Sequence, residues 1–406
     1  MQRFCPCPAV CRTLLATALF YAAASAADPW ETARLALADQ IVADEGLTNA
    51  RVIGALRTVP RHEFVPRNQQ RLAYFDLALP IGHRQTISPP SVVAYMTEQL
   101  DPQPDDRVLE VGTGSGYQAA LLGRLVCKVS TVEIVGPLGR QASATLQRLG
   151  CTNVQVAIGD GYRGWPAHAP FDKIIVTCSP GQVPEPLIAQ LREGGRLVIP
   201  LGERYQQTLC GFVKRDGRLV QTTATPTVFV PMTGEADRSR PPGWTEESPC
   251  IVNAGFEDID PANGRALGWY HPRQMAVIRS TNAPAGRQYA TFENHSPGRA
   301  TQATQAFALD GRRARVLSVS ALAHGTDLAV GPTTRTPAWI VLTFYDSEHA
   351  MLRQSALAGS AGGFDWQRIQ TRMAVPRKTR EAIIGIGLFG ATGRLSLDTV
   401  AVAVAP

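Results

Sequence analysis

Three glycines at alternate positions form the segment of this chain best suited to binding a ligand. The run "VLEVGTGSGYQ" places Gly112, Gly114 and Gly116 after an apolar, strand-like stretch and before a helix-like one. Glycine lets the backbone turn sharply there and approach a ligand closely. Glu133 ends the next predicted strand about 20 residues later, where a carboxylate can accept hydrogen bonds from a ribose diol. The spacing predicts a nucleoside-binding site.

The same segment indicates which cofactor this site takes. Its spacing is GxGxG, unlike the GxGxxG of dinucleotide-binding proteins, and no lysine follows as in a phosphate-binding P-loop. A ligand with a ribose but no phosphate fits better, which points to S-adenosylmethionine. A third predicted strand ends at "GDG" (159–161), and we expect Asp160 to reach the adenine amino group. The alternative interpretation is a glycine turn that only packs a helix against a strand, with an incidental Glu133.

Strands and helices must alternate around these residues to hold them at one edge of a sheet. From residue 106 the chain does alternate, which predicts a doubly wound parallel sheet and an α/β fold. The predicted strands are 107–112, 128–134, 154–160, 171–178 and 194–202, and the predicted helices are 114–126, 137–150 and 184–195. The run 208–232 adds a hairpin with Asp216-Gly217 at its turn.

The segment upstream of the sheet contains short helices and a polar loop. Apolar residues at helical spacing predict two short helices within 30–55, and 91–100 is predicted to be another. Between them, "RTVPRHEFVP" (57–66) is predicted to be extended because of its two prolines. The polar loop "ALPIGHRQTISPP" (78–90) follows, too rich in proline to be a core helix.

These segments together resemble the protein-L-isoaspartate O-methyltransferase family over roughly residues 33–234. The most specific motifs are "VPRHEFVP" and "ALPIGHRQTISPP", because methyltransferases in general share only the later strands. The motifs "VLEVGTGSGYQAALL", "GDGYRGWPAHAPFDKIIVT" and "LREGGRLVIPLG" agree. The resemblance implies a Rossmann-like, S-adenosylmethionine-dependent enzyme. It would methylate the free carboxylate of L-isoaspartyl and D-aspartyl residues in damaged proteins, and the ester would then close to a succinimide.

The resemblance also implies functions for individual residues. Thr86, Ile87 and Ser88 would form the substrate-binding loop over the active site, with Ser88 at the family's active-site serine position. The cofactor-binding positions would be Gly112, Thr113, Gly114, Ser115, Gly116, Glu133, Asp160 and Gly161. The family usually has glycine where this chain has Arg84. That arginine is either a tolerated surface residue or a group that biases the substrate pocket toward a carboxylate.

The chemistry of carboxylate methylation fits an orienting function for Ser88. A carboxylate is ionised at neutral pH and needs no base to become a nucleophile. The enzyme must instead hold one carboxylate oxygen in line with the methyl group, satisfy the other oxygen and exclude water. Ser88 lies outside any GxSxG elbow and has no evident His-Asp pair, so we expect it to donate a hydrogen bond rather than to attack.

Beyond a polar, proline-containing segment (235–249) the pattern becomes all-β. Period-two stretches predict a β-sandwich over 250–406, and its motifs resemble a jelly roll of the carbohydrate-binding-module type. Its ligand would be a glycan or an envelope partner. Asn253, Glu257 and Asp398 could hold a structural Ca²⁺ or simply cap strands. Of Trp269, Trp339 and Trp366, which could stack on a sugar, we expect at least two in the core.

The first 26 residues have the order of a secretory signal peptide. Arg3 and Arg12 precede an apolar run over 14–24, and "ASA" supplies small residues before a cut. We therefore expect a methyltransferase domain over 27–234 that is exported to the periplasm or beyond. The alternatives are an N-terminal anchor, a different start, or the cytoplasmic location usual for the family. No other long apolar run occurs, so we expect no membrane span in the mature chain.

Composition limits the remaining functions. The net charge of +6 is spread along the chain without a basic stripe, so we expect no nucleic-acid partner. The five cysteines after the signal segment lack CxxC spacing and are predicted to be buried small residues. Two classes of function remain: a methyltransferase of isoaspartyl proteins, or an exported binding protein whose methyltransferase half is a scaffold or serves another carboxylate.

Overall fold

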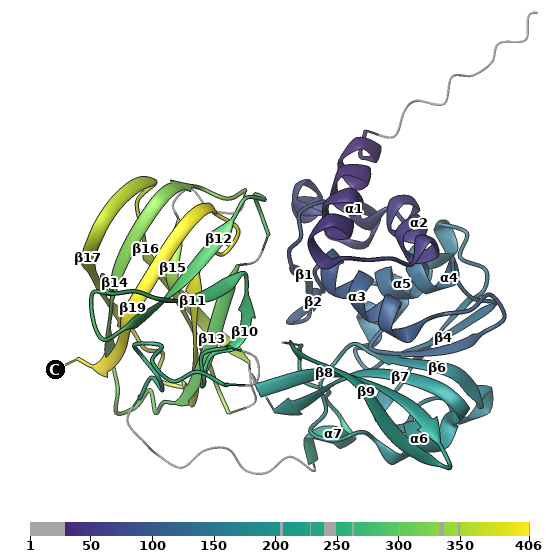
Figure 1. The fold of residues 1–406 in the computed structure, drawn as a ribbon. Helices are drawn as coiled ribbons and strands as arrows, with labels where there is room; N and C mark the ends of the chain where they lie inside the picture. Colours follow the sequence, from purple (N-terminus) through teal and green to yellow (C-terminus); the bar gives the residue numbers. More distant parts are fainter. Residues whose placement is uncertain are drawn as a thin grey trace, which may run out of the picture.

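The chain forms an α/β domain followed by a β-sandwich domain, which stand side by side (Figure 1). The computed structural model describes residues 29–203, 206–227, 229–238, 249–261, 264–299, 301–332, 337–347 and 350–405. The predicted signal peptide, 1–26, lies outside the described residues. So does most of the predicted linker, whose first four residues instead form the short helix α7 (Glu235–Arg238).

A seven-stranded sheet forms the centre of the α/β domain. Its strand order is β5-β4-β3-β6-β7-β8-β9, in which the first five strands are parallel and the last two pairings are antiparallel. The strands are β3 (Arg107–Val111), β4 (Lys128–Glu133), β5 (Val154–Ile158), β6 (Phe171–Val176), β7 (Leu191–Glu203), β8 (Gln206–Arg215) and β9 (Arg218–Thr227). The doubly wound α/β fold predicted from the sequence is confirmed. Asp216 and Gly217 form the two-residue turn between β8 and β9, both with positive φ, as predicted.

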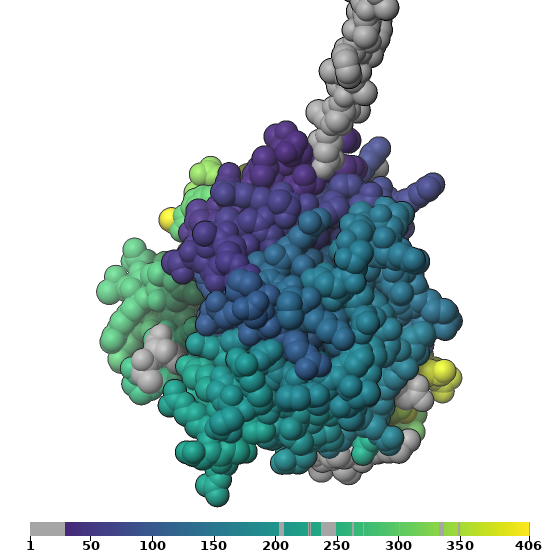
Figure 2. Space-filling model, turned by 90° about the vertical axis from the view of Figure 1, so that its right-hand side faces the viewer, coloured from purple at the N-terminus to yellow at the C-terminus, as the bar shows by residue number. Residues whose placement is uncertain are grey.

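Helices cover the sheet, and α1 and α2 lie at the top of the domain (Figures 1 and 2). The helices are α1 (Glu31–Glu45), α2 (Ala50–Thr58), α3 (Pro90–Leu100), α4 (Tyr117–Gly123), α5 (Gly136–Arg148) and α6 (Glu185–Gln190). The 3-10 turns are η1 (Arg61–Phe64), η2 (Arg67–Leu72), η3 (Gly161–Arg163) and η4 (Pro166–His168). Their apolar faces join two buried clusters, one of which contains Leu121 and Val129 and the other Leu109 and Ile174.

Two local predictions are wrong. The segment 57–66 is not fully extended, because Arg61–Phe64 forms the turn η1 directly after Pro60. Val59 and Val65, which precede Pro60 and Pro66, keep the extended backbone that a following proline imposes. The helix predicted over 184–195 ends at Gln190, because Leu191 is buried and pairs with Phe171 of β6, which starts strand β7 there.

The cysteines differ in their burial, and none of the five forms a disulfide. Cys210 is buried and Cys151 and Cys178 are partly buried, but Cys127 and Cys250 are exposed. The prediction of buried cysteines is therefore wrong for these two. Cys127 lies at the turn that leads into β4, and Cys250 lies where the sandwich domain begins, so neither is covered by a second layer.

The sandwich domain consists, in the described residues, of two antiparallel sheets of five strands each. One sheet has the order β10-β13-β18-β15-β16 and the other β11-β12-β19-β14-β17. The strands are β10 (Tyr270–Arg273), β11 (Met275–Arg279), β12 (Gln288–Asn294), β13 (Gln302–Ala308), β14 (Val316–Ala329), β15 (Ala338–Tyr345), β16 (Met351–Ala358), β17 (Gly362–Ala374), β18 (Glu381–Gly387) and β19 (Thr392–Val404). Side chains from both sheets, such as Phe292 and Ile340, fill one core. Trp269 and Trp339 are buried in it, as predicted for two of the three tryptophans.

Specific contacts fix the sandwich against the α/β domain. Arg299 forms ion pairs with Asp44 (2.8 Å) and Glu45 (3.3 Å) at the end of α1, and only 13% of its side chain is exposed. Next to it, Gly298 lies so close to Phe75 that a Cβ atom would be 2.6 Å from the ring. Strand β10 also packs beside β9. None of the helices in the described part of the chain is long and apolar enough to cross a membrane.

Candidate active site

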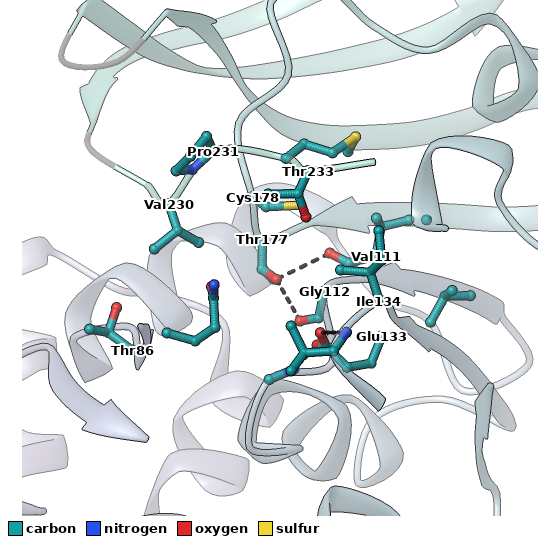
Figure 3. A pocket seen from close by; sticks show the side chains of 16 residues that line it. Thr86, Val111, Gly112, Glu133, Ile134, Thr177, Cys178, Val230, Pro231 and Thr233 are labelled. Carbon is teal, nitrogen blue, oxygen red and sulfur yellow. Dashed lines mark hydrogen bonds between the residues drawn. The ribbon is translucent and has the colours of Figure 1, made fainter. Parts of the chain in front are cut away.

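A pocket lies at the carboxyl edge of the parallel sheet, where doubly wound folds bind their ligands. It contains about 590 Å³ of space that protein atoms do not fill, part of it open to solvent. One wall consists of residues at or just after the ends of β3, β4, β5 and β6. The opposite wall consists of Gln85 and Thr86 of β2 (Gln85–Ile87) and of residues 230–233 after β9 (Figure 3).

The glycine turn after β3 forms the floor of this pocket. Gly112 has a φ of 95°, and a Cβ atom there would lie 2.5 Å from Thr177 Oγ1. The Thr177 hydroxyl donates instead to the Gly112 carbonyl at 2.7 Å, which ties the end of β6 to the turn (Figure 3). Glycine is therefore required at residue 112 both for its backbone conformation and for the close approach of Thr177.

Glu133 is held at the end of β4 by backbone hydrogen bonds. The N–H of Gly114 donates to its Oε2 at 2.7 Å and the N–H of Val135 donates to its Oε1 at 2.8 Å. Each carboxylate oxygen can accept a further hydrogen bond. Glu133 is almost fully buried, yet it lines the pocket, so both oxygens are fixed before a ligand arrives. This geometry suits recognition of two neighbouring hydroxyl groups.

A second carboxylate, Glu110 on β3, lies fully buried beneath the turn. Neither of its oxygens has a hydrogen-bond partner among the described residues. Burial raises the pKa of Glu110 from 4.5 to about 8, and the charge of Glu133 acts in the same direction. The Thr131 hydroxyl lies near enough to favour the charged form, but it hydrogen-bonds Thr113 at 2.7 Å instead. Glu110 is therefore mostly protonated at neutral pH.

The polar loop found in the sequence is a hairpin formed by β1 (Leu79–Gly82) and β2. Its two turn residues, His83 and Arg84, have φ of 50° and 60°, the left-handed conformation of a type I′ turn. Arg84 is exposed and does not line the pocket, as a tolerated surface residue would be. The preference of the family for glycine at this position is explained by the backbone conformation.

The structure brings together some of the predicted site residues but not all of them. Thr86, Gly112, Gly114, Glu133 and Gly161 line the pocket. The others lie in the same segments but outside the pocket lining: Ile87, Ser88, Thr113, Ser115, Gly116 and Asp160. Ile87 is buried in the apolar cluster of the α/β domain and Ser88, directly after it, is half-buried.

The Asp160 carboxylate contacts protein groups. Its Oδ1 accepts from the N–H of Tyr162 at 3.0 Å and its Oδ2 accepts from the N–H of Glu235 at 2.8 Å. These bonds fix the start of α7 beside the pocket. A contact of Asp160 with an adenine amino group stays a prediction.

Several lining residues were not found from the sequence. Thr177 and Cys178 follow β6, and their position after a predicted strand was the available signal. Burial raises the pKa of the Cys178 thiol to about 12, so the thiol stays protonated and unreactive. Residues 230–233 close the pocket because Pro231 pairs with Ser179 in an isolated parallel bridge, and no sequence pattern indicates that pairing.

The three residues considered for calcium make hydrogen bonds within the sandwich. The Asn253 amide donates to the carbonyls of Asp258 (2.8 Å) and Leu267 (2.9 Å). Glu257 accepts from the N–H groups of residues 287 and 288, and Asp398 from those of residues 285 and 399. These contacts are those of polar residues that fix turns.

The charge of the pocket limits its ligand. Glu133 is the only charged residue among the described residues that line it, and no lysine or arginine is present for a phosphate group. A ligand with hydroxyl groups and a positive charge fits this lining, and a phosphorylated one does not.

The chain is similar to known protein-L-isoaspartate O-methyltransferases. The model of the protein-L-isoaspartate(D-aspartate) O-methyltransferase family matches residues 34–237. A protein-L-isoaspartate O-methyltransferase of Methanoculleus marisnigri is 47% identical over 221 residues, covering 54% of this chain and 98% of the relative. A relative of the same name from Opitutus terrae is 48% identical over 228 residues, covering 55% and 97%. A solved structure of a protein-L-isoaspartate O-methyltransferase is 30% identical with a TM-score of 0.46, covering 50% of this chain and 67% of that one.

The family match begins in α1 and ends in α7, so it contains every residue that lines the pocket. This chain belongs to the protein-L-isoaspartate(D-aspartate) O-methyltransferase family.

Proposed function

We propose that this protein transfers a methyl group from S-adenosylmethionine to the free carboxylate of isoaspartyl residues in polypeptides. Family membership supports the reaction, and the pocket supports the cofactor. The observation that carries the proposal is the pocket lining, which has one fixed carboxylate, Glu133, and no cationic side chain. A nucleoside with a sulfonium charge and no phosphate matches that lining.

One wall of the pocket would bind the cofactor and the opposite wall would bind the acceptor carboxylate. Glu133 and the turn 112–116 would hold the ribose, and the bound cofactor would supply the methyl group as an electrophile. On the opposite wall, the exposed Thr86 hydroxyl can donate to one oxygen of the acceptor carboxylate (Figure 3). The other oxygen is then free to attack, and it needs no base because the carboxylate is already ionised.

The hairpin β1/β2 would orient the substrate. Thr86 pairs with Pro80 in the register of the hairpin, and Ile87 anchors the strand in the core, which fixes the position of Thr86. Ser88 lies two residues after Thr86, directly beyond β2, and would act as a second orienting donor near the acceptor. The product methyl ester would then lose methanol as the adjacent backbone nitrogen attacks it, forming the succinimide that leads back to aspartate.

A methyl-transfer assay tests the proposal. Labelled S-adenosylmethionine is offered with an isoaspartyl peptide and with the same peptide containing ordinary aspartate. We expect transfer only to the isoaspartyl peptide. Glu133→Ala should abolish the cofactor-induced rise in melting temperature, and Thr86→Val should lower kcat about tenfold while that rise remains. Glu293→Gln, at a partly exposed residue of the sandwich, is the matched control. Folded protein that binds the cofactor but methylates no isoaspartyl peptide would refute the proposal.

We also propose that the chain is exported. The order of charged, apolar and small residues in 1–26 supports this. Cell fractionation with N-terminal sequencing of the mature protein tests it. We expect periplasmic or extracellular protein that begins after Ala26, and full-length protein in the cytoplasm would refute export.

A second candidate function concerns the outer face of the sandwich. The Trp366 ring packs edge-on to Tyr289 (5.2 Å between centroids) and beside His324 (5.7 Å). Strand pairing places Ser396 next to His324 and Thr291, away from the core residues Phe292 and Leu395. Half-buried aromatic rings on an outer face are suited to stacking on a sugar. Affinity electrophoresis of the full chain in a panel of polysaccharides tests this function. Retardation that Trp366→Ala abolishes supports it, and unretarded wild-type protein refutes it.

A further inference from the structure

A cavity between the two domains lies next to the cofactor pocket. This interdomain cavity contains about 910 Å³ of space that protein atoms do not fill, part of it open to solvent. Residues of the α/β domain line one side and residues of the sandwich line the other. The first group is Glu45, Ser91, Val92, Tyr95, Leu209, Thr225 and Thr227, and the second is Arg265, Pro272, Arg273, Gln274 and Arg299.

Two chain segments connect this cavity with the cofactor pocket. Thr227 lines the cavity and Val230 lines the pocket, and three peptide units span at most about 11 Å. On the other side Thr86 lines the pocket and Ser91 the cavity, with five peptide units between them. A polypeptide whose acceptor group lies beside Thr86 would therefore reach the cavity within about two to four residues, since an extended chain advances about 3.3 Å per residue.

The charge of the cavity is opposite to that of the cofactor pocket. Three arginines and one glutamate line it, whereas the pocket has a single glutamate. Arg299 is paired with Asp44 and Glu45. Arg273, which is half-buried, makes no ion pair or side-chain hydrogen bond with any described residue, so its charge is available to a ligand.

The α/β side of the cavity adds an unused hydrogen-bonding group. Ser91 is only 2% exposed, and its hydroxyl has no hydrogen-bond partner among the described residues. The backbone N–H of Ser91 donates to Asp76 Oδ1 at 2.8 Å, which fixes Ser91 in the first turn of α3. The amino-terminal end of that eleven-residue helix favours negative charge. A buried, unpaired hydroxyl at this place opposite Arg273 fits a ligand that accepts hydrogen bonds and is negatively charged.

We propose that the interdomain cavity is a substrate subsite that binds an acidic side chain of the polypeptide, about two to four residues from the isoaspartyl residue. Arg273 of the sandwich is its specificity-determining residue. The sandwich domain therefore takes part in substrate choice, and its fixed position against α1 is what makes this possible. The proposal rests on the proposed methyltransferase function.

Matched peptides test this subsite. Each contains one isoaspartyl residue and either glutamate or glutamine at one of the positions two to four residues away, on either side. In the wild-type protein we expect kcat/KM to be about three- to tenfold higher for the best glutamate peptide than for its glutamine partner. The difference should lie in KM and should shrink as salt is added.

Variants of Arg273 then test whether this residue causes the preference for the glutamate peptide. Arg273→Ala should bring the ratio close to one by raising KM for the glutamate peptide, and Arg273→Lys should keep most of the ratio. Arg279→Ala, an exposed arginine of β11 that does not line the cavity, is the control and should leave the ratio unchanged. A wild-type ratio near one at every position, or an Arg273→Ala variant that keeps the ratio, would overturn the proposal.

The proposed function can fail separately from the subsite. If the wild-type protein methylates none of the peptides, the methyltransferase proposal fails, and binding of the fluorescently labelled glutamate peptides still measures the subsite. Weaker binding by Arg273→Ala than by Arg279→Ala would support an acidic-peptide site. Equal binding by the two variants, or no binding by the wild type, would overturn it.

Discussion

The buried carboxylate beneath the glycine turn should make the stability of the α/β domain depend on pH. Glu110 is fully buried on β3, and burial raises its pKa from 4.5 to about 8. The native state therefore keeps a proton that the unfolded chain releases above pH 4.5. Because the folded-state pKa is the higher one, the stability linked to this proton is complete below about pH 4.5 and is lost as pH rises toward 8.

The size of this effect follows from the difference between the folded-state and unfolded-state pKa values of Glu110. One pKa unit corresponds to about 1.4 kcal/mol, so a shift of 3.5 units (8 − 4.5) gives a total of roughly 5 kcal/mol. Between about pH 5.5 and pH 7.5 the wild-type free energy of unfolding should fall by roughly 2.5 kcal/mol on account of Glu110 alone. Glu110→Gln keeps the shape of the side chain and removes the titration, so its stability should lack this component.

The measurement is the difference in unfolding free energy between Glu110→Gln and the wild type, both without cofactor, at the two pH values. Urea unfolding read by pulse proteolysis reports the α/β domain separately from the sandwich, which a single spectroscopic signal would not. The difference cancels every other titrating group that the two proteins share. We expect it to move in favour of the variant by roughly 2.5 kcal/mol as pH rises.

A matched control and a clear contrary result complete this test. Hydrogen bonding to Arg394 lowers the pKa of Glu293, so Glu293→Gln should leave the difference constant over the same pH interval. If the difference for Glu110→Gln is also constant, Glu110 has the same charge in the folded and unfolded states, and the reasoning from burial is wrong.

Three further predictions concern the turn, the pocket floor and the domain interface. Arg84→Gly should stabilise the protein by about 0.5–1 kcal/mol. A left-handed φ of 60° costs an L-residue about 1–2 kcal/mol, and the larger loss of chain entropy when glycine folds offsets part of that gain. A lower urea midpoint for the variant would contradict this. Gly112→Ala should destabilise the α/β domain by about 1–3 kcal/mol, through its φ of 95° and its contact with Thr177, and should reduce the cofactor-induced thermal shift; a wild-type shift would contradict it. Arg299→Ala should weaken the domain interface by about 1–2 kcal/mol, because Asp44 and Glu45 lose their common partner; calorimetry should show the two unfolding transitions moving apart, and an unchanged profile would contradict it.

The parts of the site that could be predicted from the sequence are those fixed by residue types and by spacing along the chain. Gly112 and Glu133 stand at the ends of consecutive strands, and parallel strands bring their carboxyl ends to one edge of a sheet. The Asp216-Gly217 turn was equally predictable, because few residue pairs accept two positive φ angles. In each case the residue type and its neighbours in the chain are sufficient to explain the observed position or conformation.

The remaining parts depend on contacts between distant segments. Residues 230–233 line the pocket through the bridge between Ser179 and Pro231, and an irregular segment has no periodicity that reveals its partner. The end of α6 at Gln190 follows from the pairing of Leu191 with Phe171, which outweighs the helical pattern that continues to Gly195. Arg273 lines the interdomain cavity only because Arg299 and Gly298 fix the sandwich against the α/β domain.

The hairpin shows how a departure from a family pattern can be resolved by backbone geometry. Arg84 left two interpretations open, a tolerated surface residue or a charge directed into the substrate pocket. Because His83 and Arg84 both adopt the left-handed conformation in a two-residue turn, the backbone itself favours glycine there. The arginine is exposed and is not among the residues that line the cofactor pocket. Arg273 lies in the proposed substrate subsite, and a preference of this enzyme for acidic sequences should therefore depend on the sandwich domain.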